Sequence, residues 1–295
     1  MDIKNNILIS GCGGGYDIFV GLPLYFKLTH MGYTCYLASF GSADNLNLDK
    51  IGSFYVVTPN KQSGLEMIFP EQLLANTLGV NVYLYSDYNL ATLKSGYQTL
   101  IHELNINTTI IVDGGCDSLL TGDEINLASP LEDYMTLAAV RDINNCYLLC
   151  CGVDVEFQTH DNIEGILEQD FNHAMSYLSP VDCGRYNLED SDTPYVQKYI
   201  DTVLACIPER TLINSSIICS IWGIEGPYRP AWMVNRFGNN KFLIRHTTAN
   251  WYIFLTEDIC RRNKLLPHIV KLDRWQDIDD FITNYNDSRY HCDDY

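Results

Sequence analysis

Residues 7–17 have the sequence Ile-Leu-Ile-Ser-Gly-Cys-Gly-Gly-Gly-Tyr-Asp, and the organisation of the whole chain follows from them. The apolar run from Ile7 to Ile9 is typical of a buried strand. Four glycines then fall within five positions: Gly11, Gly13, Gly14 and Gly15. Residues 18–28 are mostly apolar and predict a helix. A strand, a glycine-rich turn and a helix in this order favour phosphate binding, because backbone N–H groups can approach the ligand and the helix N-terminus attracts negative charge.

The glycine-rich stretch differs from two well-known phosphate-binding motifs. The dinucleotide fingerprint G-x-G-x-x-G requires glycine where Tyr16 stands, and no Gly-Lys-Ser/Thr sequence follows the glycines. Asp17 stands where a cation is expected, and a carboxylate repels phosphate unless a metal ion or a ligand hydroxyl lies between them. The alternative is a tight turn in which the glycines serve only backbone geometry and close packing.

The composition limits the partners and the compartment. The chain has 295 residues, a formal charge of −18 and a pI of about 4.6. No basic stripe is present to neutralise phosphates, so we expect no nucleic-acid partner. The 11 cysteines lack a regular spacing and lie in apolar runs, which favours free thiols in the cytoplasm over disulfides. We expect no signal peptide, no membrane span and no membrane partner.

Apolar strands alternate with helices along the first 180 residues. Strands are predicted at 7–9, 33–39, 53–58, 81–86, 108–113 and 146–153, and helices at 18–28, 90–104, 130–142 and 162–178, with residues 60–71 irregular. Strands that are apolar throughout indicate a sheet covered on both faces. The sequence therefore predicts an α/β fold with a doubly wound, mainly parallel, Rossmann-like sheet and helices on both faces.

The remaining third of the chain has a looser pattern. We expect helices at 195–207 and 275–285, strands at 241–245 and 251–255, and a long apolar run at 211–222. No linker or internal repeat is visible. We interpret residues 1–295 as a single α/β domain, in which residues 1–180 form the core that carries the site loops and residues 181–295 are a C-terminal extension that completes the fold.

A second glycine-rich and acidic stretch follows the strand at 108–113. Residues 113–124 have the sequence Asp-Gly-Gly-Cys-Asp-Ser-Leu-Leu-Thr-Gly-Asp-Glu. Loops after the strands of a parallel sheet gather at one edge, where ligands bind. We therefore expect this stretch to meet the first glycine loop, together with Asp154 and Glu156, which follow the strand at 146–153.

Several carboxylates beside glycine amides suit a divalent cation. Mg²⁺ or Mn²⁺ takes oxygen ligands and bridges to phosphate oxygens. A strand-end acid could instead bind ribose hydroxyls without a metal, or the acids could only cap turns and form a solvated edge. The predicted metal ligands are Asp113, Asp117 and Asp123, and the predicted catalytic acids are Asp117, Asp123 and Glu124. The predicted phosphate- or ligand-binding residues are Gly11, Cys12, Gly13, Gly14, Gly15, Asp17, Gly114 and Gly115.

Two motifs together resemble a known family. Residues 10–18 and 113–124, with Ser-Pro-Leu-Glu-Asp at 129–133, are similar to the family catalogued as domain of unknown function 1152. The resemblance spans roughly residues 7–160. It implies that the two loops belong to one site, and it implies no particular activity.

We interpret the protein as a cytoplasmic enzyme that acts on a small molecule. The leading hypothesis is a hydrolase or transferase for a nucleotide or a phosphorylated small molecule, with Mg²⁺ or Mn²⁺ as a possible cofactor. A non-catalytic nucleotide or metabolite sensor is the competing hypothesis. A nicotinamide-dependent oxidoreductase is a third, which Tyr16 weakens. The substrate and the oligomeric state stay open.

Overall fold

A nine-stranded sheet organises the computed structural model, which describes residues 5–41, 48–60, 69–127, 129–159 and 165–290. The strand order is β3-β4-β5-β2-β1-β6-β7-β11-β8. The five central strands, from β5 to β7, are parallel. The strands at both edges pair antiparallel with their neighbours. The fold is therefore the predicted mainly parallel, Rossmann-like α/β architecture.

The bounds of the elements are as follows. The sheet strands are β1 (Asn6–Gly14), β2 (Thr34–Phe40), β3 (Lys50–Ile51), β4 (Phe54–Val57), β5 (Val82–Tyr85), β6 (Thr108–Gly114), β7 (Cys146–Cys151), β8 (Asp182–Arg185) and β11 (Asn250–Leu255), and β9 (Gly226–Tyr228) pairs separately with β10 (Phe242–Ile244). The α-helices are α1 (Asp17–Val20), α2 (Leu22–His30), α3 (Pro70–Leu78), α4 (Leu90–Glu103), α5 (Leu131–Val140), α6 (Glu168–Met175), α7 (Thr193–Ala205), α8 (Leu212–Ile221), α9 (Val234–Phe237), α10 (Thr256–Arg262), α11 (Leu266–Ile269) and α12 (Trp275–Tyr290). The 3-10 helices are η1 (Asp117–Leu119), η2 (Val153–Glu156), η3 (Pro208–Arg210), η4 (Ala231–Met233) and η5 (His246–Ala249).

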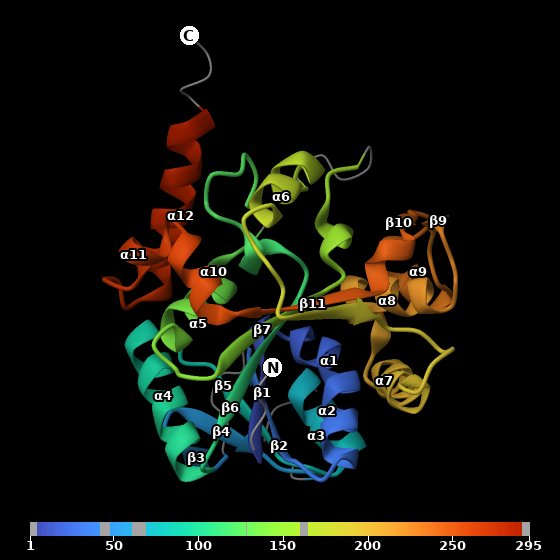
Figure 1. The fold of residues 1–295 in the computed structure, drawn as a ribbon, viewed down its shortest axis with the longest axis horizontal. Helices are drawn as coiled ribbons and strands as arrows, with labels where there is room; N and C mark the ends of the chain where they lie inside the picture. The colour runs from blue at the N-terminus through green and yellow to red at the C-terminus, as the bar shows by residue number, and fades with distance from the viewer. Residues whose placement is uncertain (1–4, 42–47, 61–68, 128, 160–164, 291–295) are drawn as a thin grey trace.

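Helices cover both faces of the sheet (Figure 1). On one face, side chains from α4, α5, α10, α11 and α12 pack against alternate residues of the strands, such as Leu8 of β1. On the other face, α1, α2, α3, α7 and α8 pack against the residues between them, such as Ile7 and Ile9. Because both faces are buried, the central strands are apolar throughout.

The order of the parallel strands creates a switch point at the middle of the sheet. The chain passes from β1 to β2 on one side, whereas β6 lies on the other side of β1. The connections that leave the carboxyl ends of β1 and β6 therefore diverge. In open α/β sheets this switch point is where ligands bind.

The predicted glycine turn is mostly strand. The first strand continues to Gly14 rather than ending at Ile9, with an irregular ladder to β2 between Ser10 and Gly14. Only Gly15 has a left-handed φ, of 68°, which a glycine accommodates without strain. The predicted helix at 18–28 is two helices separated at Gly21, where an added Cβ would lie 2.8 Å from Val112 and 3.0 Å from Ile9. This glycine lets the chain pass close over the sheet.

The other expected elements are found with three differences. Residues 70 and 71, predicted to be irregular, begin the helix α3, in which Pro70 occupies the first turn. The apolar run at 211–222 forms the buried helix α8. The helix predicted at 162–178 begins only at Glu168, and residues 160–164 lie outside the described ranges.

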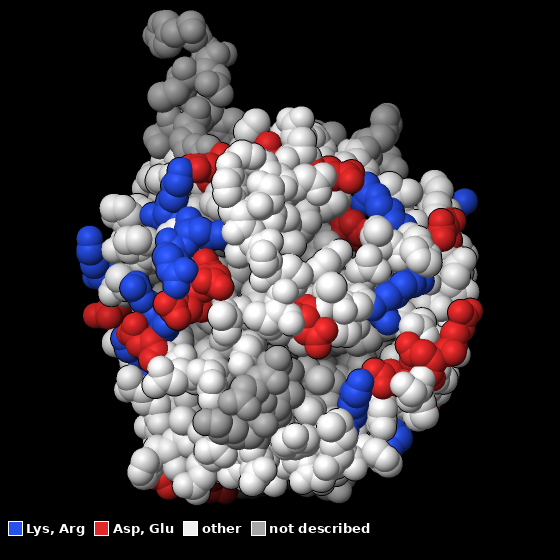
Figure 2. All heavy atoms as spheres, viewed as in Figure 1, with Lys and Arg blue, Asp and Glu red and all other residues white. Residues whose placement is uncertain are grey.

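Two further observations concern the charges over α10 and the length of the helices. Figure 2 shows basic side chains grouped over α10, whose last turn contains Arg261 and Arg262, with acidic side chains beside them. Arg261 pairs with Glu257 and Asp258 of the same helix. Among the helices that the structure describes, none combines the length and the apolar character needed to cross a bilayer.

Candidate functional site

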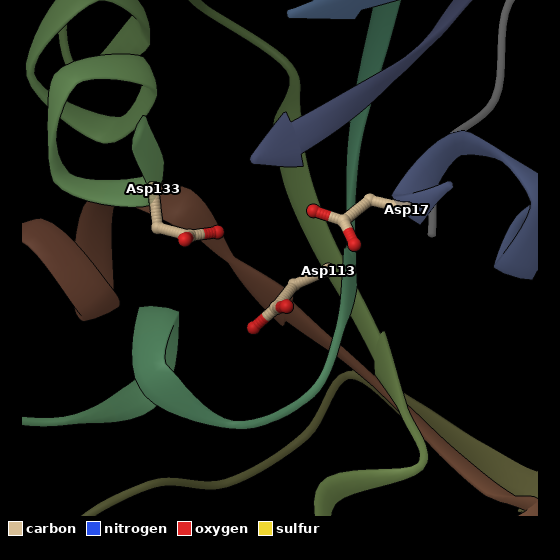
Figure 3. Close-up of side chains that lie close together, drawn as sticks. All are labelled: Asp17, Asp113 and Asp133. Atoms are coloured by element: carbon tan, nitrogen blue, oxygen red, sulfur yellow. The ribbon is translucent and has the colours of Figure 1, made fainter. Parts of the chain in front are cut away.

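Three carboxylates converge at the switch point. Asp17 begins α1 directly after β1, Asp113 lies at the carboxyl end of β6, and Asp133 lies in the first turn of α5. One carboxylate oxygen from each lies within 4.8 Å of those of the other two. Figure 3 shows the three side chains pointing toward one another from these three elements. The structure thus brings together two residues that the sequence proposed and one that it did not.

The three carboxylates differ in their hydrogen bonds. Asp17 Oδ2 accepts from the Gly13 amide at 2.9 Å. Asp113 Oδ2 accepts from the Ser118 hydroxyl, and the Cys150 thiol lies 3.8 Å from the same oxygen. Oδ1 of Asp133 is buried and has no hydrogen-bond partner within the described part of the chain. A buried carboxylate oxygen without a donor is costly, so this oxygen marks a place where a ligand would be stabilised.

Two further acids border the three. Asp117 begins η1 and is buried, and its backbone amide and that of Cys116 donate to the Glu156 carboxylate, the Cys116 bond to Oε2 being 2.6 Å long. Glu156 ends η2 after β7. Together, Asp17, Asp113, Asp117, Asp133 and Glu156 form what we call the carboxylate cluster.

Burial and mutual repulsion favour the neutral forms of these acids. Burial is the main cause that raises the pKa of Asp17, Asp117 and Asp133 well above the ordinary value, and neighbouring carboxylates add to the shift. Burial also raises the pKa of Asp113 to about 6, against the hydrogen bond from Ser118, and that of Glu156 to about 7. Of the described groups that act most strongly on these five carboxyls, none is a lysine or an arginine.

The glycines of both loops lie against carboxylates. An added Cβ at Gly13 would lie 2.8 Å from Asp17 and 3.2 Å from Asp133, and one at Gly114 would lie 3.1 Å from Asp17. A Cβ at Gly14 would overlap the carboxylate of Glu132, whereas one at Gly115 would lie 2.5 Å from that of Glu156. These glycines therefore make room at the backbone for acidic side chains, whereas the sequence analysis expected phosphate to occupy that room.

Two other predicted ligand-binding residues have packing roles. Gly11 lies inside β1 against the start of α1, where an added Cβ would lie 3.3 Å from the Ile18 amide nitrogen. Cys12 is fully buried, and its thiol contacts the backbone carbonyl of Asp133 at 3.7 Å. Burial raises the pKa of this thiol well above its ordinary value, so Cys12 stays protonated.

The structure does not bring Asp123 and Glu124 into the carboxylate cluster. Asp123 is exposed and forms an ion pair with Lys264. Glu124 accepts hydrogen bonds from the Thr121 amide and hydroxyl and from the Gly122 amide, so it closes its own loop. Asp154, also considered from the sequence, accepts from the Thr247 hydroxyl at 2.6 Å.

Asp133 and Glu132 are the site residues that the sequence reasoning missed. Both lie in the first turn of the helix predicted at 130–142, where acids are common because they complement the helix N-terminus. The Glu132 carboxylate accepts from the Gly14 amide, and the Tyr88 hydroxyl lies 3.2 Å from it. The only signal for them in the sequence was the position of Glu132 and Asp133 in the third similar stretch, 129–133.

Comparison with known proteins supports the resemblance over part of the chain. No protein with a curated description matches. The match to a family model begins after the first glycine stretch, and it includes the 113–124 loop and both Asp113 and Asp133. Residues 47–180 match the family described as "Protein of unknown function (DUF1152)", which confirms the similarity that the motifs predicted.

Proposed function

We propose that Asp17, Asp113 and Asp133 hold a divalent cation, Mg²⁺ or Mn²⁺, and that the protein is a hydrolase or transferase for a nucleotide or another phosphorylated small molecule. The observation that carries this proposal is the buried, unpartnered Oδ1 of Asp133, in a side chain that points toward two other carboxylates. A divalent cation would satisfy this oxygen and also offset the repulsion within the cluster.

The donor set suits a hard cation. All three groups are carboxylates, and hard divalent ions prefer oxygen ligands, with several positions left for water and substrate phosphates. Because Gly13 has no side chain, the carboxylates of Asp17 and Asp133 can both lie against the backbone there. A softer ion would favour thiolates, but Cys12 and Cys150 are buried thiols whose pKa is raised well above the ordinary value.

The chain's own groups would divide the remaining work. A bound divalent ion polarises a phosphoryl oxygen and makes bound water more acidic. Glu156 borders the three proposed ligands, and burial raises its pKa to about 7 in the metal-free protein, so it is our candidate to accept a proton from an attacking water or hydroxyl. We therefore assign the general base to Glu156, and we assign Asp117 to the electrostatic environment of the ion rather than to Asp123 or Glu124.

The compartment is part of the same proposal. The ten cysteines in the described ranges are all free. Free thiols in this number suit a reducing environment, which supports the cytoplasm as the place where the enzyme works.

A combined binding and turnover experiment tests the proposal. Mn²⁺ titrated into the purified protein at pH 7.5 should bind, and Asp133→Asn should weaken binding at least about tenfold. Incubation with nucleotides and sugar phosphates, followed by mass spectrometry, should show turnover that requires the ion and that Glu156→Gln slows about a hundredfold. Asp142→Asn, which removes a surface acid paired with Lys94, is the matched control and should change neither result.

Two outcomes would contradict the proposal in different ways. Absence of Mn²⁺ and Mg²⁺ binding would remove the metal site. Tight binding of one compound without turnover, unchanged by Glu156→Gln, would instead favour the non-catalytic sensor.

A further inference from the structure

Five backbone amides of these two loops already donate to oxygens of the protein. The Gly13 amide donates to Asp17 at 2.9 Å, and the Gly14 amide donates to Glu132. The Gly15 amide donates to the carbonyl of Phe40 at 3.3 Å. In the second loop, the amides of Cys116 and Asp117 both donate to Glu156. A phosphate cradle requires N–H groups that point at the ligand, and these five point at oxygens of the protein.

Charge at the site also opposes a bare anion. The cluster contains five carboxylates, and Glu132 lies beside it against Gly14. The described groups that act most strongly on the five cluster carboxyls are other acids, thiols, the Ser118 hydroxyl and backbone amides, and none is a basic side chain. An anionic ligand would therefore find no positive partner in the cluster, and each carboxylate that is ionised would repel it unless positive charge lies between them.

We infer that the ligand is a metal-chelating anion, of the diphosphate or triphosphate class, held through the ion at Asp17, Asp113 and Asp133 and not through the glycine amides. This inference rests on the proposed function. The metal must bind first. The five amides already donate to protein oxygens and carboxylates offer an anion no attraction, so the ion is the partner to which the ligand binds.

The coordination of the ion explains the preference for a chelating ligand. An octahedral ion that takes one oxygen from each of three carboxylates keeps half of its positions for water or ligand. Two adjacent phosphates can fill two of these positions from one molecule, so the second contact forms at a high effective concentration. A single phosphate, without further partners in the protein, gains one contact and still meets the surrounding carboxylates.

Inorganic diphosphate and inorganic phosphate are the probes that test this inference. Calorimetric titration at pH 7.5 should show diphosphate binding in the presence of Mn²⁺ at least about tenfold tighter than phosphate. In EDTA, diphosphate binding should weaken at least about a hundredfold. Because diphosphate also binds Mn²⁺ in solution, Asp133→Asn protein reports the background and should show none of the specific binding. Asp142→Asn, which keeps the cluster intact, should match the wild type.

The outcomes separate this inference from the proposal on which it rests. If Mn²⁺ binds but diphosphate binds equally well in EDTA, the ligand is held by the protein directly and the inference is wrong. Equal affinity for phosphate and diphosphate, or no binding of either to the Mn²⁺-loaded protein, would also overturn it. Failure of Mn²⁺ itself to bind, measured first and alone, would refute the proposed metal site as well.

Discussion

Replacing Asp133 with asparagine should make the metal-free protein more stable. The substitution keeps the shape of the side chain but removes one charge from three carboxylates whose oxygens lie within 4.8 Å of one another. At an effective dielectric constant of 20, two full charges at that separation repel by about 3.5 kcal/mol. Asp133 has two such neighbours and partial protonation lowers each repulsion, so we expect the free energy of unfolding to rise by about 2–4 kcal/mol at pH 7.5.

Urea and thermal unfolding in EDTA measure this effect. The expected gain corresponds to a rise in Tm of roughly 4–8 °C. At pH 4 the difference should nearly vanish, because the wild-type carboxyls, with their raised pKa values, are then neutral. Mn²⁺ at a thousand times its Kd should reverse the order, since it stabilises the wild type by about 4.1 kcal/mol and the variant by little.

The control and the refuting result are clear. Asp142→Asn breaks an exposed pair with Lys94 and should change stability by less than about 1 kcal/mol. If Asp133→Asn is less stable than the wild type in EDTA at pH 7.5, the carboxylates do not repel one another in the empty protein. The physical reason for placing a cation there would then be lost.

Three further predictions concern pH, a glycine and the outer loop. In EDTA, the free energy of unfolding should fall as pH rises from about 4 to about 7. Burial raises the pKa of Glu71 from 4.5 to about 7 and that of Asp113 from 3.8 to about 6, so both carboxyls hold protons in the folded state that the unfolded chain has released. Above about pH 7, each carboxyl lowers the free energy of unfolding by about 3 kcal/mol. A pH series of urea unfolding curves measures the sum. Gly13→Ala should weaken Mn²⁺ binding at least about tenfold in calorimetry, because its methyl group would lie against two cluster carboxylates; an unchanged affinity would refute the assigned position of the ion. Asp123→Asn should leave Mn²⁺ affinity within about twofold of the wild type, since Asp123 pairs with Lys264 at the surface, and a large loss would place it back among the ligands.

The sequence predicted the architecture because its strands have a strong pattern. Apolar strands separated by helices specify a parallel sheet, and the acids that follow β1 and β6 must then lie at the same edge. The structure accordingly places Asp17 and Asp113 together. This inference needed only strand order and the direction of the chain.

Other parts of the site depend on packing that a local pattern does not contain. Asp133 fits equally well as a helix-capping acid, and only the packing of α5 against β1 and η1 aims it at the cluster. The glycines at 13 and 14 were interpreted as free donors, yet their amides and the space above them are taken by Asp17 and Glu132. A run of glycines shows that something approaches the backbone, and it does not show whether that is a ligand or the protein itself.

The most direct test of the metal site is anomalous diffraction from crystals grown with saturating Mn²⁺ at pH 7.5. We expect one strong anomalous peak bonded to carboxylate oxygens of Asp17, Asp113 and Asp133, with Asp133 Oδ1 among the ligands. The metal–oxygen distances should be about 2.1–2.2 Å, as for small hard divalent ions. Absence of a peak between these three carboxylates at saturating Mn²⁺, or a peak only at other acidic residues, would contradict the account.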